Sequence, residues 1–573
     1  MVKYVRSLVI ALFGMGILQA QWVTESYDLK AGWNAIWVSH DVTHDELDDL
    51  LDSHLTILQI WRWNPVSSQV IFQGSSTEFI DADAQWLKWD RNTPTVNTLN
   101  RLYGNSAYLV EVADGTANFT LSLKGKAISP AYSWSSDGTN LLGFATDEAS
   151  SSHSKTFQTF FGLGGKASTD GSFYQYNGGA IGANPVQVFT TFIDPVERGK
   201  AYWVNGLDYS DFYGPIKIIA TRQNLDYGTS GSIRSFRVEN VTDSELTITL
   251  TPADSESAPT GQEAVAGSVP LSLRGALDLT TLQYDYTDFD TAHSVVLAAG
   301  EQQEFSFRVN RQEMTGEAGD LFQSLITVTD SLGVMRHHLP VTAEITSKAG
   351  LWVGVAVVNE VDQITAAPVP QDDGTATVEV TRAIDRSTST GFEMRLILHR
   401  DADGNIRVLQ KAHIGKNSEG EYVVTADESL LDADALESAT RVSTAHFPFN
   451  AALTAAGADL GTTGTLSVSA NLAHTDAHNP FLHTYHPDHD NKDAQFNLAA
   501  LPAGQESFSV YRSIELEFTD DASTVGVNDG GWGSTVVGGV YRETISGLRA
   551  QDIDVQGGFV LYRVNEVSTF EAN

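Results

Sequence analysis

Alternation of apolar and polar residues along short segments constrains the fold of this chain more than any other feature. Leu246, Ile248 and Leu250 are separated by single polar residues, and residues 305–309 repeat the pattern. Successive side chains of a β-strand point to opposite faces, so a period of two predicts strands that bury one face. Polar turns such as residues 330–333 separate these segments. The chain is therefore predicted to be mainly β, with several β-sandwich-like domains in tandem and few short helices.

The chain has no cysteine among its 573 residues, so disulfides cannot stabilise its domains. Packed cores must do so instead, and the composition allows them, because 42% of the residues are hydrophobic and 10% are aromatic. At roughly 150 residues per domain, a chain of this length is predicted to form about four domains.

The first twenty residues have the features of a bacterial signal peptide. Lys3 and Arg6 give a basic start, and residues 8–18 form a short apolar run. Ala20 then supplies a small residue at a cleavage position. The apolar run is shorter than the roughly 20 residues that a spanning helix needs. We expect cleavage near Ala20, a mature chain without a transmembrane segment, and a location that is secreted, extracellular or in the cell envelope.

The charge of the chain is strongly acidic, with 72 acidic residues against 35 basic ones and a formal net charge of −37. Such a surface repels nucleic-acid phosphates and anionic lipids, so the charge argues against a nucleic-acid partner and against unaided adhesion to anionic membranes. Solubility or salt adaptation explains the charge without any specific partner. The partners we expect are envelope components, glycans or other surface proteins.

Three segments of the N-terminal region recur later in the same order, which predicts an internal duplication. The paired segments are 32–36 with 138–142, 61–64 with 174–177, and 107–110 with 201–204. Loops on a β scaffold change length more readily than its strands do, so the unequal spacing is compatible with two copies of one unit. We expect one β module over residues 21–129 and a second over residues 130–220.

This repeated unit resembles a module of secreted bacterial proteins that has a Gly-Trp-Asn signature, an apolar strand and a later Gly-x-Ala-Tyr-Trp-like strand. Residues 32–38, 138–144 and 199–204 carry the resemblance, which covers about a third of the chain. The resemblance implies a location outside the cytosol, and it transfers no catalytic residue.

Residues 221–346 resemble the immunoglobulin-like modules that act as spacers in bacterial surface proteins. The Val-Glu-Asn-Val-Thr-Asp passage at 238–243 carries this resemblance together with the alternating strands, and the cysteine pair of antibody domains is absent. The resemblance implies an immunoglobulin-like β-sandwich with a spacer role.

Residues 347–573 are predicted to form a larger C-terminal β domain with a histidine-rich loop. Apolar residues at alternate positions over 392–398 indicate one strand, and residues 401–405 indicate a turn that leads into a second. Residues 541–545 and 559–564 indicate the closing strands.

One short helix is predicted in the first module. Thr43 and Glu46 have the spacing of a capping box. The leucines that follow have helical spacing, and they are Leu47, Leu50, Leu51 and Leu55. The helix would cover one face of a sheet.

Histidines concentrate in residues 474–490, which contain five of the fifteen histidines of the chain. Imidazoles and carboxylates are the usual nitrogen and oxygen ligands of zinc and related metals. The candidate metal ligands are His474, His478, His483, His486, Asp488, His489 and Asp490. Pro480 and Pro487 prevent an ordinary helix, so the ligands would have to converge from a loop. A polar loop that packs against its own domain explains the same residues without a metal.

Calcium is the second cofactor hypothesis, because Asp401, Asp403 and Asn405 cluster oxygen ligands in the manner of a calcium loop. The EF-hand pattern fails, since Ile406 stands where glycine is required and His413 where a bidentate glutamate is required. An Asp-Gly-Asn hairpin turn accounts for the same residues.

Nine of the eleven tryptophans lie between positions 22 and 203. If they are exposed, Trp61, Trp63, Trp86 and Trp89 could stack on sugar rings. Core packing is the alternative interpretation, because the duplicated segment carries tyrosines at the positions of the first two tryptophans. Alternation places Trp61 and Trp63 on the same side of one strand.

These features support three functional hypotheses. The first is a secreted or cell-surface multidomain protein with a structural, adhesive or binding role and no enzymatic activity, since the sequence has no complete nucleophile or phosphate-binding motif. The second is a metal-dependent hydrolase with a metal-bound water as nucleophile, whose candidate ligands are His483, His486, His489 and Asp488. The third is a carbohydrate-binding protein that uses the N-terminal aromatic residues.

Overall fold

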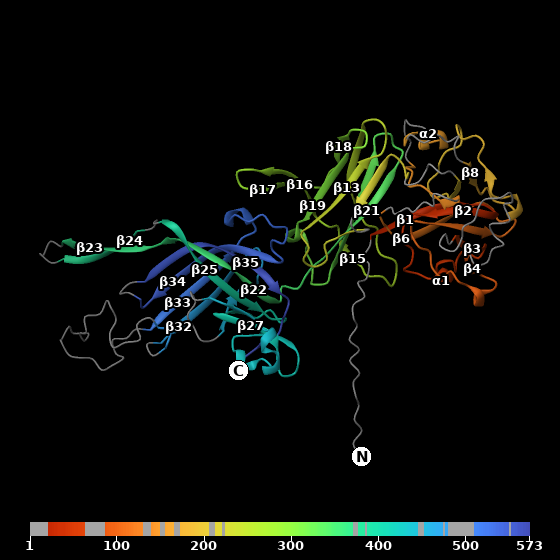
Figure 1. The fold of residues 1–573 in the computed structure, drawn as a ribbon. Helices are drawn as coiled ribbons and strands as arrows, with labels where there is room; N and C mark the ends of the chain where they lie inside the picture. The colour runs from red at the N-terminus through yellow and green to blue at the C-terminus, as the bar shows by residue number, and fades with distance from the viewer. Residues whose placement is uncertain are drawn as a thin grey trace, which may run out of the picture. The chain divides into compact units, whose positions relative to one another are not determined.

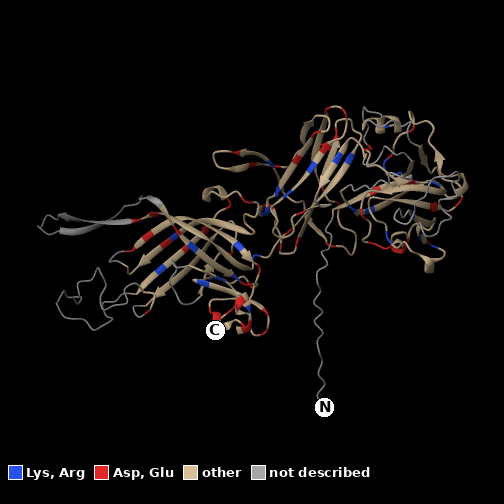
Figure 2. Cartoon of the chain, viewed as in Figure 1, with Lys and Arg blue, Asp and Glu red and all other residues tan. Residues whose placement is uncertain are grey.

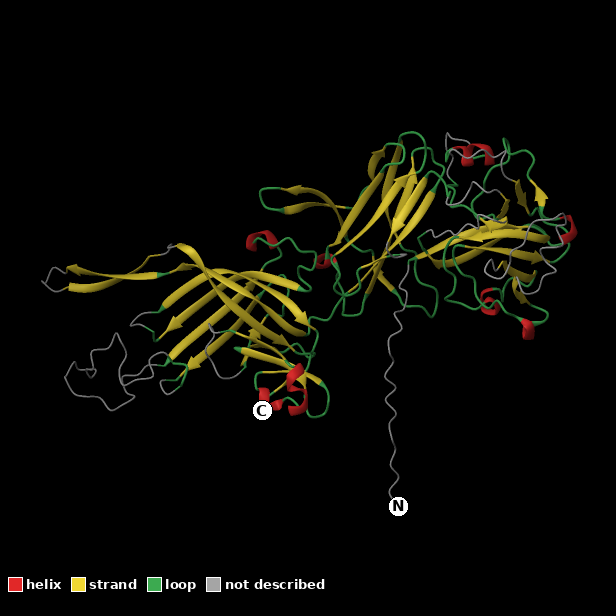
Figure 3. Ribbon diagram, viewed as in Figure 1, coloured by secondary structure: helices red, strands yellow, loops and turns green. Residues whose placement is uncertain are grey.

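The computed structural model describes most of the chain as β-strands joined by loops (Figures 1 and 3). The described residues are 21–63, 86–129, 139–148, 155–164, 172–205, 212–220, 224–370, 376–383, 387–444, 452–473, 476–479, 509–548 and 552–572. Within them, the α-helices are the short α1 (Leu47–Leu50) and α2 (Phe157–Gly162). The prediction of a mainly β chain with several sheets in tandem is confirmed. No helix in these ranges has the length and apolar character needed to span a bilayer.

The chain divides into two compact units. Unit 1 contains the described residues up to Val309 together with Asp320–Glu344, and unit 2 contains Asn310–Gly319 and Ile345–Asn573.

The first sheet of unit 1 has the strand order β2-β5-β3-β4. These strands are β2 (Gly32–Val38), β5 (Ser106–Val112), β3 (Ile57–Trp63) and β4 (Trp86–Asp90). A separate ribbon pairs β1 (Trp22–Leu29) with β6 (Phe119–Lys126). The buried core beneath the sheet includes Ile36, Ile60 and Val110, one from each of three neighbouring strands. Alternating inward positions thus build this core from residues far apart in sequence.

The second sheet of unit 1 has the equivalent strand order, β7-β10-β8-β9. Its strands are β7 (Thr139–Leu142), β10 (Tyr202–Asn205), β8 (Ser172–Gln175) and β9 (Val186–Gln187). The hydroxyl of Tyr108 accepts a hydrogen bond from the Tyr103 backbone N–H at 2.6 Å, and the hydroxyl of Tyr202 accepts one from the Glu197 N–H at 3.0 Å. The two tyrosines therefore have the same local contact, while the duplication itself stays a prediction from the sequence.

The prediction of a capping box before α1 is wrong. Glu46 is the N-cap of the helix and makes no side-chain capping bond, while the Thr43 hydroxyl donates to the Asp41 carboxylate at 2.9 Å. The nearby carboxylate competes for the hydroxyl that would have capped the helix. The helix is a single turn in which Leu47 is buried, whereas Leu55 lies beyond it and is 68% exposed.

Residues 216–344 contain an immunoglobulin-like β-sandwich of two sheets. One sheet has the order β11-β13-β19-β16-β17, and the other has the order β12-β21-β20-β14-β18, with β15 (Val265–Gly267) paired to β20. The first sheet contains β11 (Ile216–Ala220), β13 (Ile233–Asn240), β19 (Gln302–Val309), β16 (Leu271–Asp278) and β17 (Gln283–Asp288). The second contains β12 (Leu225–Asp226), β21 (Arg336–Glu344), β20 (Leu321–Asp330), β14 (Leu246–Asp254) and β18 (His293–Leu297).

The alternating residues predicted to face inward do form the core of this sandwich. Leu246, Ile248 and Leu250 on β14 are all buried, as are Phe305 and Phe307 on β19. The polar turn at residues 330–333 joins β20 to β21 as predicted.

Unit 2 contains a nine-stranded sheet with the order β30-β26-β25-β22-β35-β34-β33-β32-β31. Its strands are β30 (Leu453–Thr454), β26 (Ile406–Val408), β25 (Ser387–Arg400), β22 (Gly350–Val361), β35 (Ile553–Asn565), β34 (Val536–Ser546), β33 (Val510–Phe518), β32 (Thr465–Leu472) and β31 (Ala456–Gly457). One residue separates β30 from β31 in sequence, and β30 also contacts β32, so the two ends of this sheet lie close together. One continuous core, which includes Trp352, Leu516 and Phe559, fills the concave side.

Two smaller sheets complete unit 2. A ribbon pairs β23 (Gln363–Pro370) with β24 (Ala376–Ala383). A four-stranded sheet has the order β29-β27-β28-β36. Its strands are β29 (Thr440–Ser443), β27 (Lys411–Lys416), β28 (Tyr422–Thr425) and β36 (Phe570–Glu571).

Candidate functional site

Most of the candidate metal ligands lie outside the described residues. These are His474, His483, His486, Asp488, His489 and Asp490. His478 is described, and its Nδ1 lies 3.2 Å from Oδ1 of Asp476, which also accepts the His478 backbone N–H at 2.8 Å. Within the described ranges, no group of three or more His, Cys, Asp or Glu side chains has the arrangement of a metal site. The metal site therefore stays a prediction.

The candidate calcium loop forms the hairpin turn between β25 and β26, as the alternative interpretation predicts. Oδ1 of Asp401 accepts the backbone N–H groups of Asp403 and Asn405 at 3.1 and 2.8 Å, and Oδ2 receives the Arg407 guanidinium at 2.9 Å. Gly404 has a φ of 90°, which favours glycine. Burial raises the pKa of Asp401, but the bonds from Arg407 and Asn405 outweigh it and lower the pKa to about 2. The turn itself therefore satisfies this carboxylate.

The interpretation of the N-terminal tryptophans as exposed stacking platforms is wrong for three of the four. Trp61, Trp86 and Trp89 are buried, and Trp63 is half-buried. Trp61 and Trp63 both contact the ring of Trp86, with centroids 6.0 and 5.0 Å apart, so they lie on one side of β3 as predicted. Core packing, the alternative interpretation, is confirmed for the buried three.

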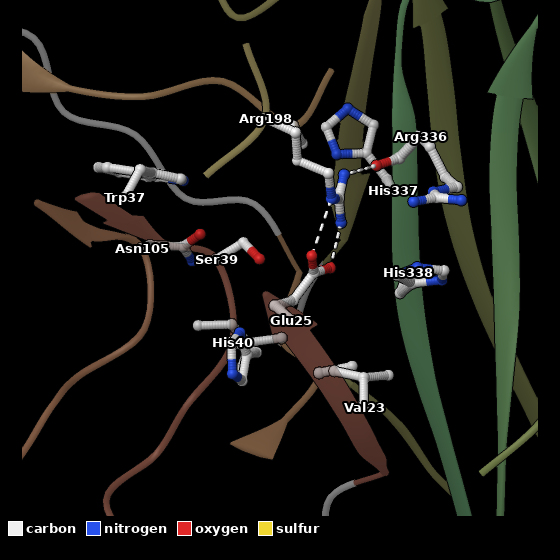
Figure 4. Close-up of a pocket in the computed structure, with 13 residues that line it drawn as sticks. Val23, Glu25, Trp37, Ser39, His40, Asn105, Arg198, Arg336, His337 and His338 are labelled. Atoms are coloured by element: carbon white, nitrogen blue, oxygen red, sulfur yellow. Dashed lines mark hydrogen bonds and ion pairs between the residues drawn. The ribbon is translucent and has the colours of Figure 1, made fainter. Parts of the chain in front are cut away.

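A cluster of buried polar side chains lies where three parts of unit 1 meet (Figure 4). Glu25 lies on β1, Arg198 precedes β10, and His337 and His338 lie on β21. Arg198 Nε donates to Oε2 of Glu25 at 3.0 Å, and its Nη2 bonds Oε1 of the same carboxylate. His40, which follows β2, has its Nε2 3.0 Å from the carbonyl oxygen of Leu123.

Burial and the Arg198 charge shift the pKa values in this cluster. Burial raises the pKa of Glu25, but the hydrogen bonds and charge of Arg198 outweigh burial and bring this pKa below its ordinary value. Burial lowers the pKa of His40 to about 4 and that of His337 to about 3, and the Arg198 charge adds to the shift of His337. At neutral pH the cluster thus contains one ion pair and neutral imidazoles.

The polar cluster joins parts of unit 1 and has no room for a substrate. The cavity between its side chains has a volume of about 30 Å³, which is enough for one or two water molecules. Arg198 Nη1 also donates to the backbone carbonyls of Thr146 and Arg336 at 3.1 and 3.3 Å, so one guanidinium ties together three segments of the chain. Sequence reasoning missed this cluster because its members are far apart in sequence and follow no local pattern.

A two-stranded arm, residues 274–288 of the β16–β17 hairpin, extends from the sandwich (Figure 1). Among the described strands, β16 pairs with β19 only as far as Leu273, and β17 is the last strand of its sheet. At its base, the buried Phe289 packs edge-on against Phe307, with ring centroids 4.9 Å apart. The arm is thus anchored in the core at one end only.

The tip of the arm carries large apolar side chains that contact little else. Leu279 is 79% exposed and Leu282 is 74% exposed, while the nearby Leu277 and Tyr284 are each more than a third exposed. Leu282 has a φ of 56°, a left-handed conformation that is unusual for a residue with a branched side chain. Leu279 and Leu282 thus form an exposed apolar tip on the arm, and Leu282 holds a backbone conformation that costs free energy.

Side-chain contacts along the arm hold this tip in a defined shape. The Arg274 guanidinium lies over the Tyr284 ring at 4.6 Å, and the Arg308 guanidinium lies over the Tyr286 ring at 4.0 Å. The Asp278 carboxylate accepts the Thr280 backbone N–H at 2.7 Å, and this bond lowers the pKa of Asp278 below its ordinary value.

A second apolar surface of unit 1 is the loop that follows β9. Phe189 is 78% exposed, and Phe192 and Ile193 are each 63% exposed with respect to the described residues. The loop backbone is anchored, since the Gln158 N–H donates to the carbonyl oxygen of Thr191 at 2.9 Å.

Comparison with known proteins identifies no family for this chain. No protein-family model matches the chain, and no curated protein matches it. The CsuC–CsuE chaperone–tip adhesion subunit complex of Csu pili from Acinetobacter baumannii is 11% identical and covers 33% of this chain and 94% of its own, with a TM-score of 0.14. The CupB2 chaperone of Pseudomonas aeruginosa is 9% identical and covers 36% and 97%, with a TM-score of 0.15. TM-scores this low support no statement about function, and the sandwich assignment follows from the strand pairing described above.

Proposed function

We propose that this chain is an exported multidomain β protein that binds a protein partner outside the cytosol, at the cell surface or in the cell envelope. The observation that carries the proposal is the arm, with Leu279 and Leu282 exposed at its tip. An isolated two-stranded hairpin is at best marginally stable in water, and exposed apolar side chains add nothing to its stability. Burial of these leucines in a complex would stabilise the arm and the complex together.

The rest of unit 1 supports a presenting role for this arm. The Glu25–Arg198 ion pair links β1 to the segment before β10, and Arg198 also bonds the backbone on β21. Side-chain bonds between separate segments of this kind make unit 1 more rigid, and the arm projects from this unit. The exposed loop at residues 188–193 offers a second apolar contact on the same unit.

The exported location rests on residues 1–20 and their signal-peptide features. Acidic residues are distributed over the strands and loops (Figure 2), and the formal net charge of −37 is compatible with a protein that stays in aqueous surroundings outside the cell.

The test is binding of the fluorescently labelled full chain to whole bacterial cells and to isolated envelope fractions. The double variant Leu279→Ser/Leu282→Ser removes the apolar tip without changing the charge, and we expect it to lose most of the binding. Leu55→Ser is the matched control, because Leu55 is also an exposed leucine of unit 1, at 68%, and lies outside the arm.

Equal binding of wild type and the double variant would show that the arm has no role in binding. A purified chain that binds neither cells nor envelope fractions, yet hydrolyses a test substrate, would replace the binding role with an enzymatic one.

A further inference from the structure

The arm combines apolar and acidic groups within a small surface. Asp278 lies at the end of β16, and Asp285 and Asp288 lie on the exposed strand β17. With Arg274 as the one basic residue in residues 274–288, the arm has a net charge of −3 + 1 = −2. Asp278 has a lowered pKa because the backbone N–H of Thr280 bonds its carboxylate, so it remains charged at neutral pH.

The basic side chain of the arm, Arg274, contacts other residues of the chain. The Arg274 guanidinium covers the Tyr284 ring, and its Nη2 lies 3.6 Å from Oε1 of Glu304. This side chain lies against the sandwich strand β19, while the Asp278 carboxylate at the tip accepts hydrogen bonds from the Thr280 N–H and the Thr281 hydroxyl. The contact surface offered by the tip is therefore apolar with an acidic border.

This pattern disfavours two of the possible occupants. A second copy of the chain would bring Asp278 and Asp285 against their own equivalents, and charges on an edge strand are a known means of preventing self-pairing. An anionic membrane would repel the same carboxylates.

We propose that the arm inserts Leu279 and Leu282 into an apolar groove of another protein, and that lysine or arginine side chains border this groove. This inference rests on the proposed binding function and adds the chemistry of the partner. The leucines supply the buried area, and Asp278 and Asp285 supply charge complementarity, which gives specificity and faster association. The length of β16 beyond Leu273, five residues, allows the tip to reach about 17 Å past the sheet.

The experiment is selection of peptides from a phage-displayed library of random dodecapeptides on the immobilised full-length chain. We expect the enriched peptides to combine leucine or aromatic residues with lysine or arginine. Their affinity is then measured in solution for wild type and for three variants, Leu279→Ser/Leu282→Ser, Asp278→Asn/Asp285→Asn and Leu55→Ser.

The leucine variant has the charge of the wild type, so it separates specific binding from general attraction of basic peptides to an acidic protein. We expect it to weaken binding by about a hundredfold, which corresponds to two side chains at about tenfold each. We expect the asparagine variant to weaken binding by about tenfold at low salt and less at high salt. Leu55→Ser should leave the affinity unchanged.

Three results would overturn the inference. The first is enrichment of peptides without basic residues, and the second is equal affinity of the selected peptides for the leucine variant and wild type. The third is evidence that the tip binds something other than a partner protein. A dimer in sedimentation that dissociates in the leucine variant would show self-association, and leucine-dependent binding to phosphatidylcholine–phosphatidylglycerol vesicles would show membrane binding.

If the selected peptides lack basic residues but need the leucines, the partner chemistry is wrong and the binding function stands. If neither peptides nor cells need the leucines, both fail.

Discussion

Glu25 and Arg198 lie 173 positions apart in sequence and form a buried ion pair with two hydrogen bonds inside unit 1. Their side chains are 13% and 6% exposed, so water contributes little to the solvation of either charge. Loss of one member would leave the other buried without an opposite charge beside it, which is far more costly than loss of an exposed pair.

Replacement of Glu25 by glutamine should therefore destabilise unit 1 by roughly 3–5 kcal/mol. The measurement is the free energy of unfolding of unit 1 from urea denaturation of the full chain. Glu197→Gln is the control, because the Glu197–Lys200 pair is exposed and should contribute no more than about 0.5 kcal/mol. Equal effects of the two substitutions would contradict the assigned role of the buried pair.

Unit 1 should lose stability as the pH falls below neutral. The unfolded histidines titrate near 6.5, whereas burial holds the pKa of His40 at about 4 and that of His337 at about 3 in the folded state. The unfolded state thus binds more protons below pH 6.5, so stability is present above this pH and decreases as the pH falls toward 4 and then 3. At about 1.4 kcal/mol per pKa unit, His40 alone accounts for roughly 3 kcal/mol.

The measurement for the histidines is the unfolding free energy of unit 1 between pH 7 and pH 4. His337→Leu should reduce the acid dependence, since both ring nitrogens of His337 are buried without a hydrogen-bond partner among the described residues. His293→Leu changes an exposed histidine and should leave the dependence unaltered. A pH-independent wild type would show that these histidines are not buried as described.

The large sheet of unit 2 contains its own buried polar group. The Tyr541 hydroxyl donates to Oε2 of Glu543 at 2.6 Å, and the Arg512 guanidinium bonds the same carboxylate. Tyr541→Phe should cost about 1.5–3 kcal/mol, because it removes a buried hydrogen bond to a charged group. Tyr511→Phe, at a 44% exposed position, should cost nothing measurable by denaturation. Similar costs for both tyrosines would contradict the burial of this network.

Export predicts a defined N-terminus for the mature protein. N-terminal sequencing of the chain recovered from a producing bacterium should begin at Gln21, directly after the expected cleavage near Ala20. Gln21 is itself fully buried, and its backbone carbonyl accepts the Ala127 N–H at 2.7 Å, so the structure of β1 is anchored from this position onward. Recovery of a cytoplasmic chain that begins at Met1 would contradict export.

The sequence predicts much of the fold because strands and turns leave local patterns. Leu246, Ile248 and Leu250 alternate with polar residues and all lie in the sandwich core. The turn at residues 401–405 could be predicted from the sequence, because an aspartate side chain shortly before a glycine accepts hydrogen bonds from the backbone N–H groups of a tight turn. The capping box fails because Asp41, outside the motif, takes the Thr43 hydroxyl.

The polar cluster and the arm could not be predicted in the same way. Glu25 and Arg198 belong to no shared motif, and only the folded backbone brings them together. Leu279 and Leu282 look like core residues in the sequence, because hydrophobicity does not show that a hairpin extends past its neighbouring strand. The tryptophans show the opposite case. The sequence makes Trp61 and Trp86 equally suited to a core and to a binding surface, and the structure shows that they are buried.

Site-specific photo-crosslinking in a bacterium that produces the full chain tests whether the tip of the arm contacts a protein partner. A benzoylphenylalanine residue is placed at position 279 in one strain and at position 55 in the control strain, since both leucines are exposed on unit 1. We expect a discrete protein adduct from position 279 that is absent from position 55 and that is lost when Leu282 is also replaced by serine. No adduct at position 279, or the same adducts at both positions, would contradict this expectation.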